Sequence, residues 1–168
     1  MNKKLNLYII SGIVFTIIVG TLLHFVYEWS GSNSIVGLFS PINESVWEHM
    51  KLLFYPMSIW IIWGYFKFGK SNPNYICASL IGLVSGLILI PVLFYTYTAI
   101  AAKTILWLDI TIFVVSIVIA FLIMRHILKN YNLRCLSVKK GIFLWEILFV
   151  LFVLFTISPP DIPLFREF

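Results

Sequence analysis

The stretch SPINESVWEHMK, residues 40–51, places two carboxylates, an imidazole, an amide and an ammonium within one short segment. The sequence on both sides of this stretch is strongly apolar. Of the 168 residues, 61% are hydrophobic and 11% are charged, compared with about 45–50% and about 25% in an average soluble domain. A water-soluble fold cannot bury so much apolar surface, so the sequence predicts an integral membrane protein.

Five apolar runs cover residues 5–27, 46–66, 75–98, 105–128 and 142–157. A helix of about 20 residues crosses a hydrocarbon core about 30 Å thick. The sequence therefore predicts an all-α fold, with one membrane domain of five transmembrane helices across residues 1–168. The second run begins inside the polar stretch. Ser40 followed by Pro41 is typical of a helix start, and Ser45 and Glu48 have the spacing of a capping box, so both Ser40 and Ser45 are possible first residues.

The Lys and Arg residues predict the orientation of the five spans, because cytoplasmic loops retain positive charge. With strict alternation, nine of the 12 basic residues fall on one side, so we expect a cytoplasmic N-terminus and an extracytoplasmic C-terminus. Cys77 and Cys135 fall on the predicted cytoplasmic side, where a structural disulfide is not expected. The basic residues form no continuous stripe, so no nucleic-acid partner is expected. The nine are Lys3, Lys4, Lys67, Lys70, Arg125, Lys129, Arg134, Lys139 and Lys140, and the other three are Lys51, Lys103 and Arg166.

Most acidic and imidazole groups of the spans fall at the predicted extracytoplasmic end. Ionisable residues within membrane spans are costly, so their accumulation at one level indicates a functional site. Two carboxylates one helical turn apart repel each other unless a cation, a shared proton or a lysine offsets the repulsion. The residues at this level are His24, Glu28, Glu44, Glu48 and His49, with Asp109 about one turn inside the fourth span.

Imidazole and carboxylate ligands together suit Zn²⁺, and also Fe²⁺ or Mn²⁺ where more oxygen ligands are present. His24 and Glu28 are four residues apart, so the first span can present a His/Glu pair to a second pair on the next span. The predicted metal ligands are His24, Glu28, His49 and Glu44. A structural interpretation is also open, in which Glu44 and Glu48 interact with the dipole of a helix N-terminus and Glu48 pairs with Lys51.

The same groups predict catalytic roles. Glu48 is the expected general base and Glu44 a second ligand or proton carrier. Lys51 and Asn43 are expected to stabilise developing negative charge. The predicted supporting residues are Ser40, Ser45, Trp47, Asp109 and Asp161.

Residues 40–49 and 159–165 resemble a family of small uncharacterised bacterial integral membrane proteins, which carry an SPxNESxWEH segment and a PPxxPLF tail. This resemblance implies a multi-pass protein of a bacterial plasma membrane and no settled activity. Residues 43–49 are also similar, more loosely, to the first motif of the hemolysin III and progestin-receptor-like membrane hydrolases. That resemblance implies metal-dependent hydrolysis, whereas the chain has no later His-x3-His pair.

Three functions follow as hypotheses. The leading one is a hydrolase of a lipid or lipid-linked substrate at the extracytoplasmic leaflet. The second is a small transporter or binding module that uses the same carboxylates for a cation or a proton-coupled solute. The third is an accessory membrane subunit without a site of its own. The expected partners are the lipid bilayer and a lipid or small-molecule substrate.

Overall fold

The computed structural model describes residues 2–67, 69–130 and 137–167, and this part of the chain is helical without a strand. Each predicted apolar run forms a helix, and most of these helices extend a few residues beyond the run, so the all-α class is confirmed. The long helices are α1 (Asn2–Trp29), α3 (Val46–Lys67), α4 (Tyr75–Ala101), α5 (Leu106–Asn130) and α6 (Val138–Ile157). The short elements are α2 (Ser34–Gly37) and the 3-10 turns η1 (Gly69–Ser71) and η2 (Pro163–Phe165).

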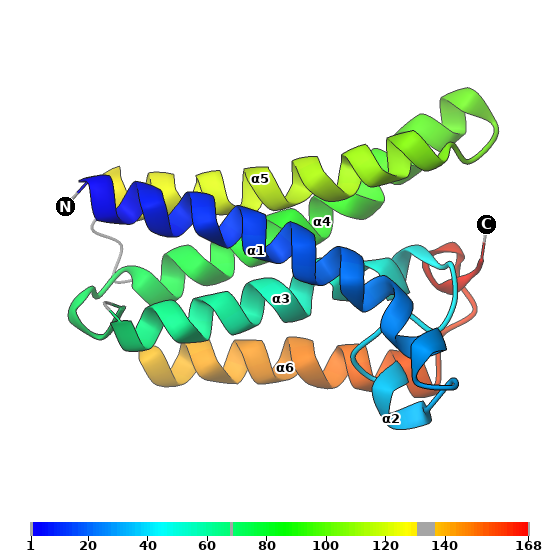
Figure 1. The fold of residues 1–168 in the computed structure, drawn as a ribbon, viewed down its shortest axis with the longest axis horizontal. Coiled ribbons are helices and arrows are strands. Elements are labelled where there is room, and N and C mark those ends of the chain that lie inside the picture. Colours follow the sequence, from blue (N-terminus) through cyan, green and yellow to red (C-terminus); the bar gives the residue numbers. More distant parts are fainter. Residues whose placement is uncertain (1, 68, 131–136, 168) are drawn as a thin grey trace.

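The long helices lie side by side, and the two chain ends lie at opposite ends of the bundle (Figure 1). Helix α3 packs against α1 and α4, and α5 packs against the same two helices. Helix α6 lies along α3 on the side away from α1 (Figure 1). The connection between α1 and α3, which contains α2 and the polar stretch, lies at the same end as the C-terminal turn η2 (Figure 1).

Within the described residues, four helices are long and apolar enough to cross a membrane: α1 from Lys3, α4, α5 and α6. Helix α3 is not among them, although its 22 residues would extend about 33 Å. It carries Glu48, His49 and Lys51 in its first two turns, which lowers its hydropathy. It is also deeply buried, with Leu53 and Met57 fully enclosed. A helix enclosed by protein does not need the apolar surface that lipid requires.

Small residues allow the helix backbones to approach one another closely. A Cβ atom on Gly20 of α1 would lie 2.4 Å from the backbone oxygen of Leu52 in α3. A Cβ on Gly82 of α4 would lie 2.6 Å from the backbone oxygen of Ala120 in α5. These contacts explain why glycine occupies both positions, since any larger side chain would separate the helices.

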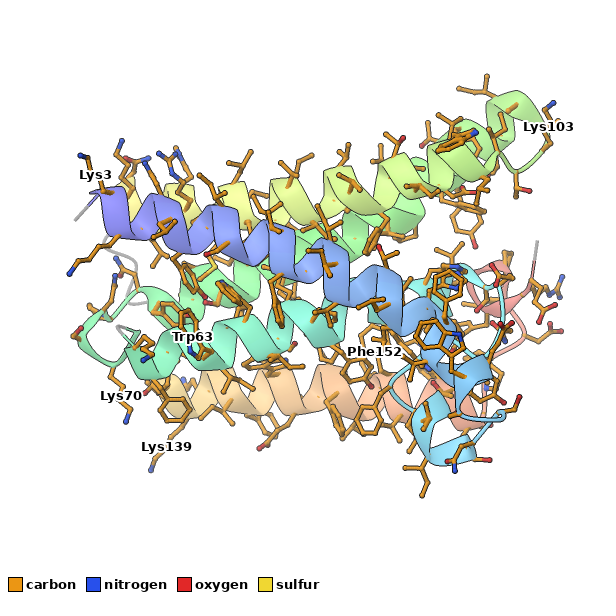
Figure 2. All side chains as sticks on the ribbon, viewed as in Figure 1. Lys3, Trp63, Lys70, Lys103, Lys139 and Phe152 are labelled. Atoms are coloured by element: carbon orange, nitrogen blue, oxygen red, sulfur yellow. The ribbon has the colours of Figure 1, made fainter. Side chains whose placement is uncertain are left out.

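Basic residues gather at the end of the bundle that holds the N-terminus. Lys3, Lys70 and Lys139 lie there, whereas Lys103 lies at the other end (Figure 2).

Cys77, near the start of α4, is disulfide-bonded, so the expectation of no structural disulfide is wrong for this residue. That expectation rested on the compartment assigned from charge and used no geometry. Cys135 lies outside the described residues.

Candidate metal centre

Three of the four predicted metal ligands meet at the end of the bundle that holds the C-terminus. His24 lies near the end of α1, His49 in the first turn of α3, and Glu44 in the loop before α3. One ligand atom from each lies within 4.8 Å of the others. The two imidazole Nε2 atoms are 3.2 Å apart, and Glu44 approaches His49 Nε2 to 3.4 Å and His24 Nε2 to 4.0 Å. The sequence predicted that ligands of the first span meet ligands of the second, and His24 of α1 does meet His49 of α3.

The orientation of the His49 ring is fixed by its own helix start. Its Nδ1 lies 2.9 Å from the backbone oxygen of Ser45, and a carbonyl oxygen only accepts, so Nδ1 carries the proton. In the neutral ring Nε2 then has a lone pair, which faces a carboxylate oxygen of Glu44. Two lone pairs face each other unless a second proton or a metal cation lies between them. A backbone carbonyl that orients a histidine in this way is typical of metal-ligating histidines.

Glu44 is the most exposed member of the group, with 66% of its side chain accessible, compared with 34% for His24 and 30% for His49. The hydrogen bond from His49 lowers the pKa of the Glu44 carboxyl below its usual value, although partial burial acts in the opposite direction. The charges on His49 and His24 also lower this pKa. Glu44 is therefore ionised near neutral pH and can reorient to complete a ligand set.

The helix that carries His49 begins at Val46, so the later of the two predicted starts is the observed one. The Ser45 hydroxyl oxygen accepts a hydrogen bond from the backbone N–H of Glu48 at 3.4 Å, as expected for a helix cap. The Glu48 side chain does not complete the capping box. It accepts instead from the backbone N–H of Ile42 at 3.0 Å, while Asn43 Oδ1 accepts from the Ser45 N–H at 3.0 Å.

Ser40 connects the loop to α1 next to His24. Its hydroxyl donates to the backbone oxygen of Leu23 at 2.6 Å and accepts from the backbone N–H of Tyr27 at 3.1 Å. Residues 23 and 27 would otherwise bond to each other in a regular helix, so the hydroxyl is inserted into the hydrogen-bond ladder of α1. Ser40 is fully buried. It therefore fixes the turn of α1 on which His24 lies.

Glu48 and Lys51 form a second, buried group next to the metal ligands. Lys51 Nζ donates to Glu48 Oε2 at 2.6 Å, to the backbone oxygen of Gly37 at 2.9 Å and to that of Ser40 at 3.4 Å. The other carboxylate oxygen of Glu48 accepts from the Thr156 hydroxyl of α6 at 3.1 Å. Lys51 is 0% exposed and Glu48 is 2% exposed. The pair thus joins the loop of residues 37–42 to α3 and α6.

This geometry gives Glu48 and Lys51 a structural role, because the ammonium group and both carboxylate oxygens have partners within the chain. The general-base role of Glu48 and the charge-stabilising role of Lys51 remain predictions from the sequence. Asn43 uses its carbonyl oxygen on Ser45, so its amide nitrogen is the atom that could donate to a substrate. Glu28 is exposed and does not join the three ligands within the described part of the chain.

The remaining predicted residues lie around this group. Trp47 packs against Phe152 of α6, with ring centroids 4.7 Å apart, and against Phe165 of the tail at 5.0 Å. The tail is therefore folded back on the start of α3. Asp109 accepts a hydrogen bond from Tyr97. Asp161 pairs with Arg166 at 2.8 Å on the exposed tail.

Sequence reasoning missed two residues that hold this region together. Thr156 donates to Glu48 from a distance of 108 residues along the chain, and Tyr97 donates to Asp109 from the preceding helix. Thr156 lies two residues before Ser158-Pro159-Pro160, a helix-breaking segment that gave no signal of a partner. Tyr97 belongs to the polar run of residues 95–98 near the end of α4. This run lies at the same end of the bundle as the metal ligands, and that position was the signal in the sequence that could have identified Tyr97.

The chain belongs to the family of unknown function DUF6512, whose model matches residues 1–168. Comparison with curated proteins and with solved structures found no match. An uncharacterised family that covers the whole chain agrees with the first resemblance predicted from the sequence. The similarity to hemolysin III-type hydrolases remains a prediction.

Proposed function

We propose that this protein is a membrane-embedded, zinc-dependent hydrolase whose metal is held by His24, Glu44 and His49. The observation that carries this proposal is the convergence of two imidazole Nε2 atoms and one carboxylate within 4.8 Å. Two ligand atoms at tetrahedral positions around Zn²⁺, each about 2.05 Å from the ion, lie about 3.3 Å apart. The pairs at 3.2 Å and 3.4 Å fit this spacing. A small movement of the exposed Glu44 would bring the third distance into range.

Two histidines and one glutamate favour a catalytic site over a structural one. Three protein ligands leave a fourth position for water or substrate, and the ion would supply Lewis-acid polarisation there. Both carboxylate oxygens of Glu48 have partners within the chain. We therefore assign proton transfer to Glu28 in place of Glu48, because Glu28 lies one helical turn from His24 and is exposed. The amide nitrogen of Asn43 is the donor we assign to developing negative charge.

An enzyme is favoured over a transporter because the buried side chains of α3 below the site carry no ionisable group, and the hydroxyl of Ser58 is the polar group among them. The buried α3 side chains that follow Lys51 include Leu53, Phe54, Met57 and Ile61. A conducting path for a cation would need polar groups along this length. The alternative function, a cation transporter or binding module, would use the same three ligands. The measurements described below distinguish it from the enzyme.

The substrate class we propose is a lipid or lipid-linked molecule. Phe25 and Trp29 follow His24 along α1, stack on each other with centroids 5.8 Å apart, and are 43% and 69% exposed. Exposed aromatic residues at a helix end are typical of the membrane interface. A lipid headgroup bond at this level would lie beside the three ligands.

We also propose five spans, with α3 as the enclosed fifth, and an extracytoplasmic site in a plasma membrane. The lysines at the opposite end support this orientation. The disulfide at Cys77 opposes it, because disulfides are rare in the cytosol and this residue lies at the lysine-rich end. Labelling of an introduced cysteine, Lys103→Cys, by a membrane-impermeant maleimide in intact cells decides the orientation, since labelling is expected only if that end is extracytoplasmic.

The metal assignment is tested on protein purified in detergent, exchanged against Zn²⁺ and measured by elemental analysis. We expect one Zn²⁺ per chain in the wild type and less than a tenth of that in His24→Ala and His49→Ala. His126→Ala is the matched control, because it replaces the third histidine, which lies exposed on α5, and it should keep wild-type content. Equal zinc in all four proteins, or none in any, contradicts the proposal.

The reaction is tested in proteoliposomes that contain a fluorogenic phospholipid ester. Zinc-dependent release of the fluorophore, lost in His49→Ala and kept in His126→Ala, supports the hydrolase. Zinc flux into the vesicles, followed with an entrapped indicator, would support the transporter instead.

A further inference from the structure

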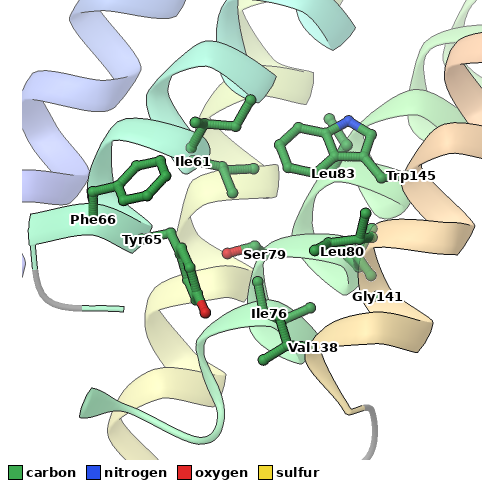
Figure 3. Close-up of a pocket in the computed structure, with 12 residues that line it drawn as sticks. Ile61, Tyr65, Phe66, Ile76, Ser79, Leu80, Leu83, Val138, Gly141 and Trp145 are labelled. Atoms are coloured by element: carbon green, nitrogen blue, oxygen red, sulfur yellow. The ribbon is translucent and has the colours of Figure 1, made fainter. Parts of the chain in front are cut away.

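An apolar groove lies between α3, α4 and α6, away from the metal ligands. Its volume is about 180 Å³, which exceeds the approximately 150 Å³ of an apolar cavity known to hold benzene. Figure 3 shows Tyr65 and Phe66 of α3, Ile76 and Leu80 of α4, and Val138 of α6 around this space. A groove of this composition and size suits a segment of hydrocarbon chain.

The groove begins at the lysine-rich end of the bundle and follows α6 as far as Trp145. Val138 is the first residue of α6 and Trp145 lines the other end, so the groove follows about 10 Å of the helix axis. Trp145 is held in place because its Nε1 donates to the Ser58 hydroxyl of α3 at 3.0 Å. On its open side the groove is bordered by Ile62, 48% exposed, and Ile142, 46% exposed.

Positive charge lies at the mouth of the groove. Lys70 Nζ lies 4.9 Å from the ring centroid of Phe66, which itself lines the groove. Lys139 directly follows Val138, another lining residue, and both lysines lie at the same end of the bundle (Figure 2). An apolar groove with ammonium groups at its mouth is complementary to a molecule with a hydrocarbon tail and an anionic head.

We propose that this groove binds one anionic phospholipid of the surrounding bilayer, with an acyl chain between α3 and α6 and its phosphate near Lys70 and Lys139. This proposal goes beyond the metal site and does not depend on it. A second cavity of about 290 Å³ continues past Trp145 along α3 and α6, but it is lined by the carboxylate-bearing Glu146. The acyl chain is therefore assigned to the first groove, which has no acidic side chain among its lining residues.

Basic pockets between membrane helices bind lipid headgroups by the same combination of charge and apolar surface. Each lysine near the bilayer surface contributes about fivefold in affinity for an anionic lipid. The two lysines together predict a preference of about 30-fold for phosphatidylglycerol over phosphatidylcholine with the same acyl chains.

The test is native mass spectrometry of delipidated, detergent-purified protein titrated with palmitoyl-oleoyl phosphatidylglycerol or phosphatidylcholine. We expect one phosphatidylglycerol to bind per chain with the preference given above. Lys70→Gln with Lys139→Gln should reduce that preference to less than threefold, while Lys103→Gln at the opposite end should leave it unchanged. Glycerol phosphate, which has the head without the chain, should not compete at tenfold excess over the lipid.

A groove-filling variant tests the location. Ile142→Trp should weaken phosphatidylglycerol binding at least tenfold, whereas Ile147→Trp should not, because Ile147 lies on the same helix with 39% exposure and does not line the groove. Equal melting temperatures of the two variants exclude misfolding as the cause. Equal binding of both lipids, equal binding by both tryptophan variants, or a dimer of this chain that Ile142→Trp disrupts would each overturn the proposal.

Discussion

Replacement of Lys51 by methionine is the sharpest test of how the polar stretch is held. Methionine keeps the aliphatic stem of the side chain but removes the ammonium group that bonds Glu48, Gly37 and Ser40. The Glu48 carboxylate would then be buried without a counter-charge. The expected result is a large loss of stability together with release of the loop of residues 37–42.

The magnitude follows from the burial of the pair. Lys51 is 0% exposed and Glu48 is 2% exposed, and removal of one partner of a buried ion pair costs about 3–5 kcal/mol. Adding Glu48→Gln to Lys51→Met should restore about half of that loss. The amide removes the uncompensated charge, while its oxygen can still accept from the Ile42 N–H and its NH2 group can donate to the Thr156 hydroxyl. Glu48→Gln alone also removes one partner of the pair, so the coupling free energy in the double-mutant cycle should exceed the roughly 2 kcal/mol that is restored, with the sign of a favourable pair.

The free energy of unfolding can be followed in mixed micelles by the fluorescence of the six tryptophans as the SDS fraction is raised. Lys103→Met is the matched control, because this lysine is exposed between α4 and α5 and its loss should change stability by less than about 0.5 kcal/mol. The reasoning is refuted if Lys51→Met unfolds within 0.5 kcal/mol of the wild type, as expected of a surface site. It is also refuted if the double variant is no more stable than Lys51→Met.

Three further predictions concern the neighbouring contacts. Ser40→Ala should lower zinc affinity about 10–100-fold, the range seen when a contact that supports a metal ligand is lost. Competition with a chromophoric chelator measures this affinity. An unchanged affinity would show that the Ser40 hydroxyl does not position His24. In metal-free protein at mildly acidic pH, above the usual carboxyl pKa of 4.5, Glu44 is ionised and the facing His49 can carry its second proton, so wild type should melt above Glu44→Gln. This difference should vanish as the pH falls through the lowered pKa of the folded state, and a difference that grows on acidification would contradict the assigned ion pair. Trp47→Ala should accelerate proteolysis of the C-terminal tail, because Phe165 loses the ring it packs on, and equal cleavage rates would exclude this contact as the anchor.

The helices could be predicted from the sequence because the membrane imposes a simple requirement on their length and composition. The run 75–98 became α4 (Tyr75–Ala101), and the run 46–66 became α3. Where the bounds differ, the cause is local and polar. Helix α6 begins at Val138 because the Ser137 hydroxyl accepts from the Lys140 N–H at 3.4 Å, so two lysines that belong to no apolar run are nevertheless helical.

The site was predicted only in part, because the assignment of side chains to faces depended on where α3 starts. A helix from Ser40 would place Glu44 and Glu48 on one face. With the helix starting at Val46, Glu44 lies in the loop and faces the histidines, whereas Glu48 points into the protein. The different burial of Glu44 and Glu48 also gives the two carboxylates different roles. Spacing alone does not indicate which carboxylate meets the buried Lys51 and which stays 66% exposed.

The position of these charges explains why the first two turns of α3, a helix within a membrane bundle, contain Glu48 and Lys51. A buried pair is weak evidence for stability, since apolar residues of the same shape often stabilise a protein as well. Its particular value here is that it holds backbone groups that no apolar side chain could satisfy, the Gly37 and Ser40 carbonyls and the Ile42 N–H. Those groups belong to the loop that continues into Glu44. The buried charges therefore place a metal ligand, and the ionisable residues of this stretch form one functional unit although only some of them can touch the ion.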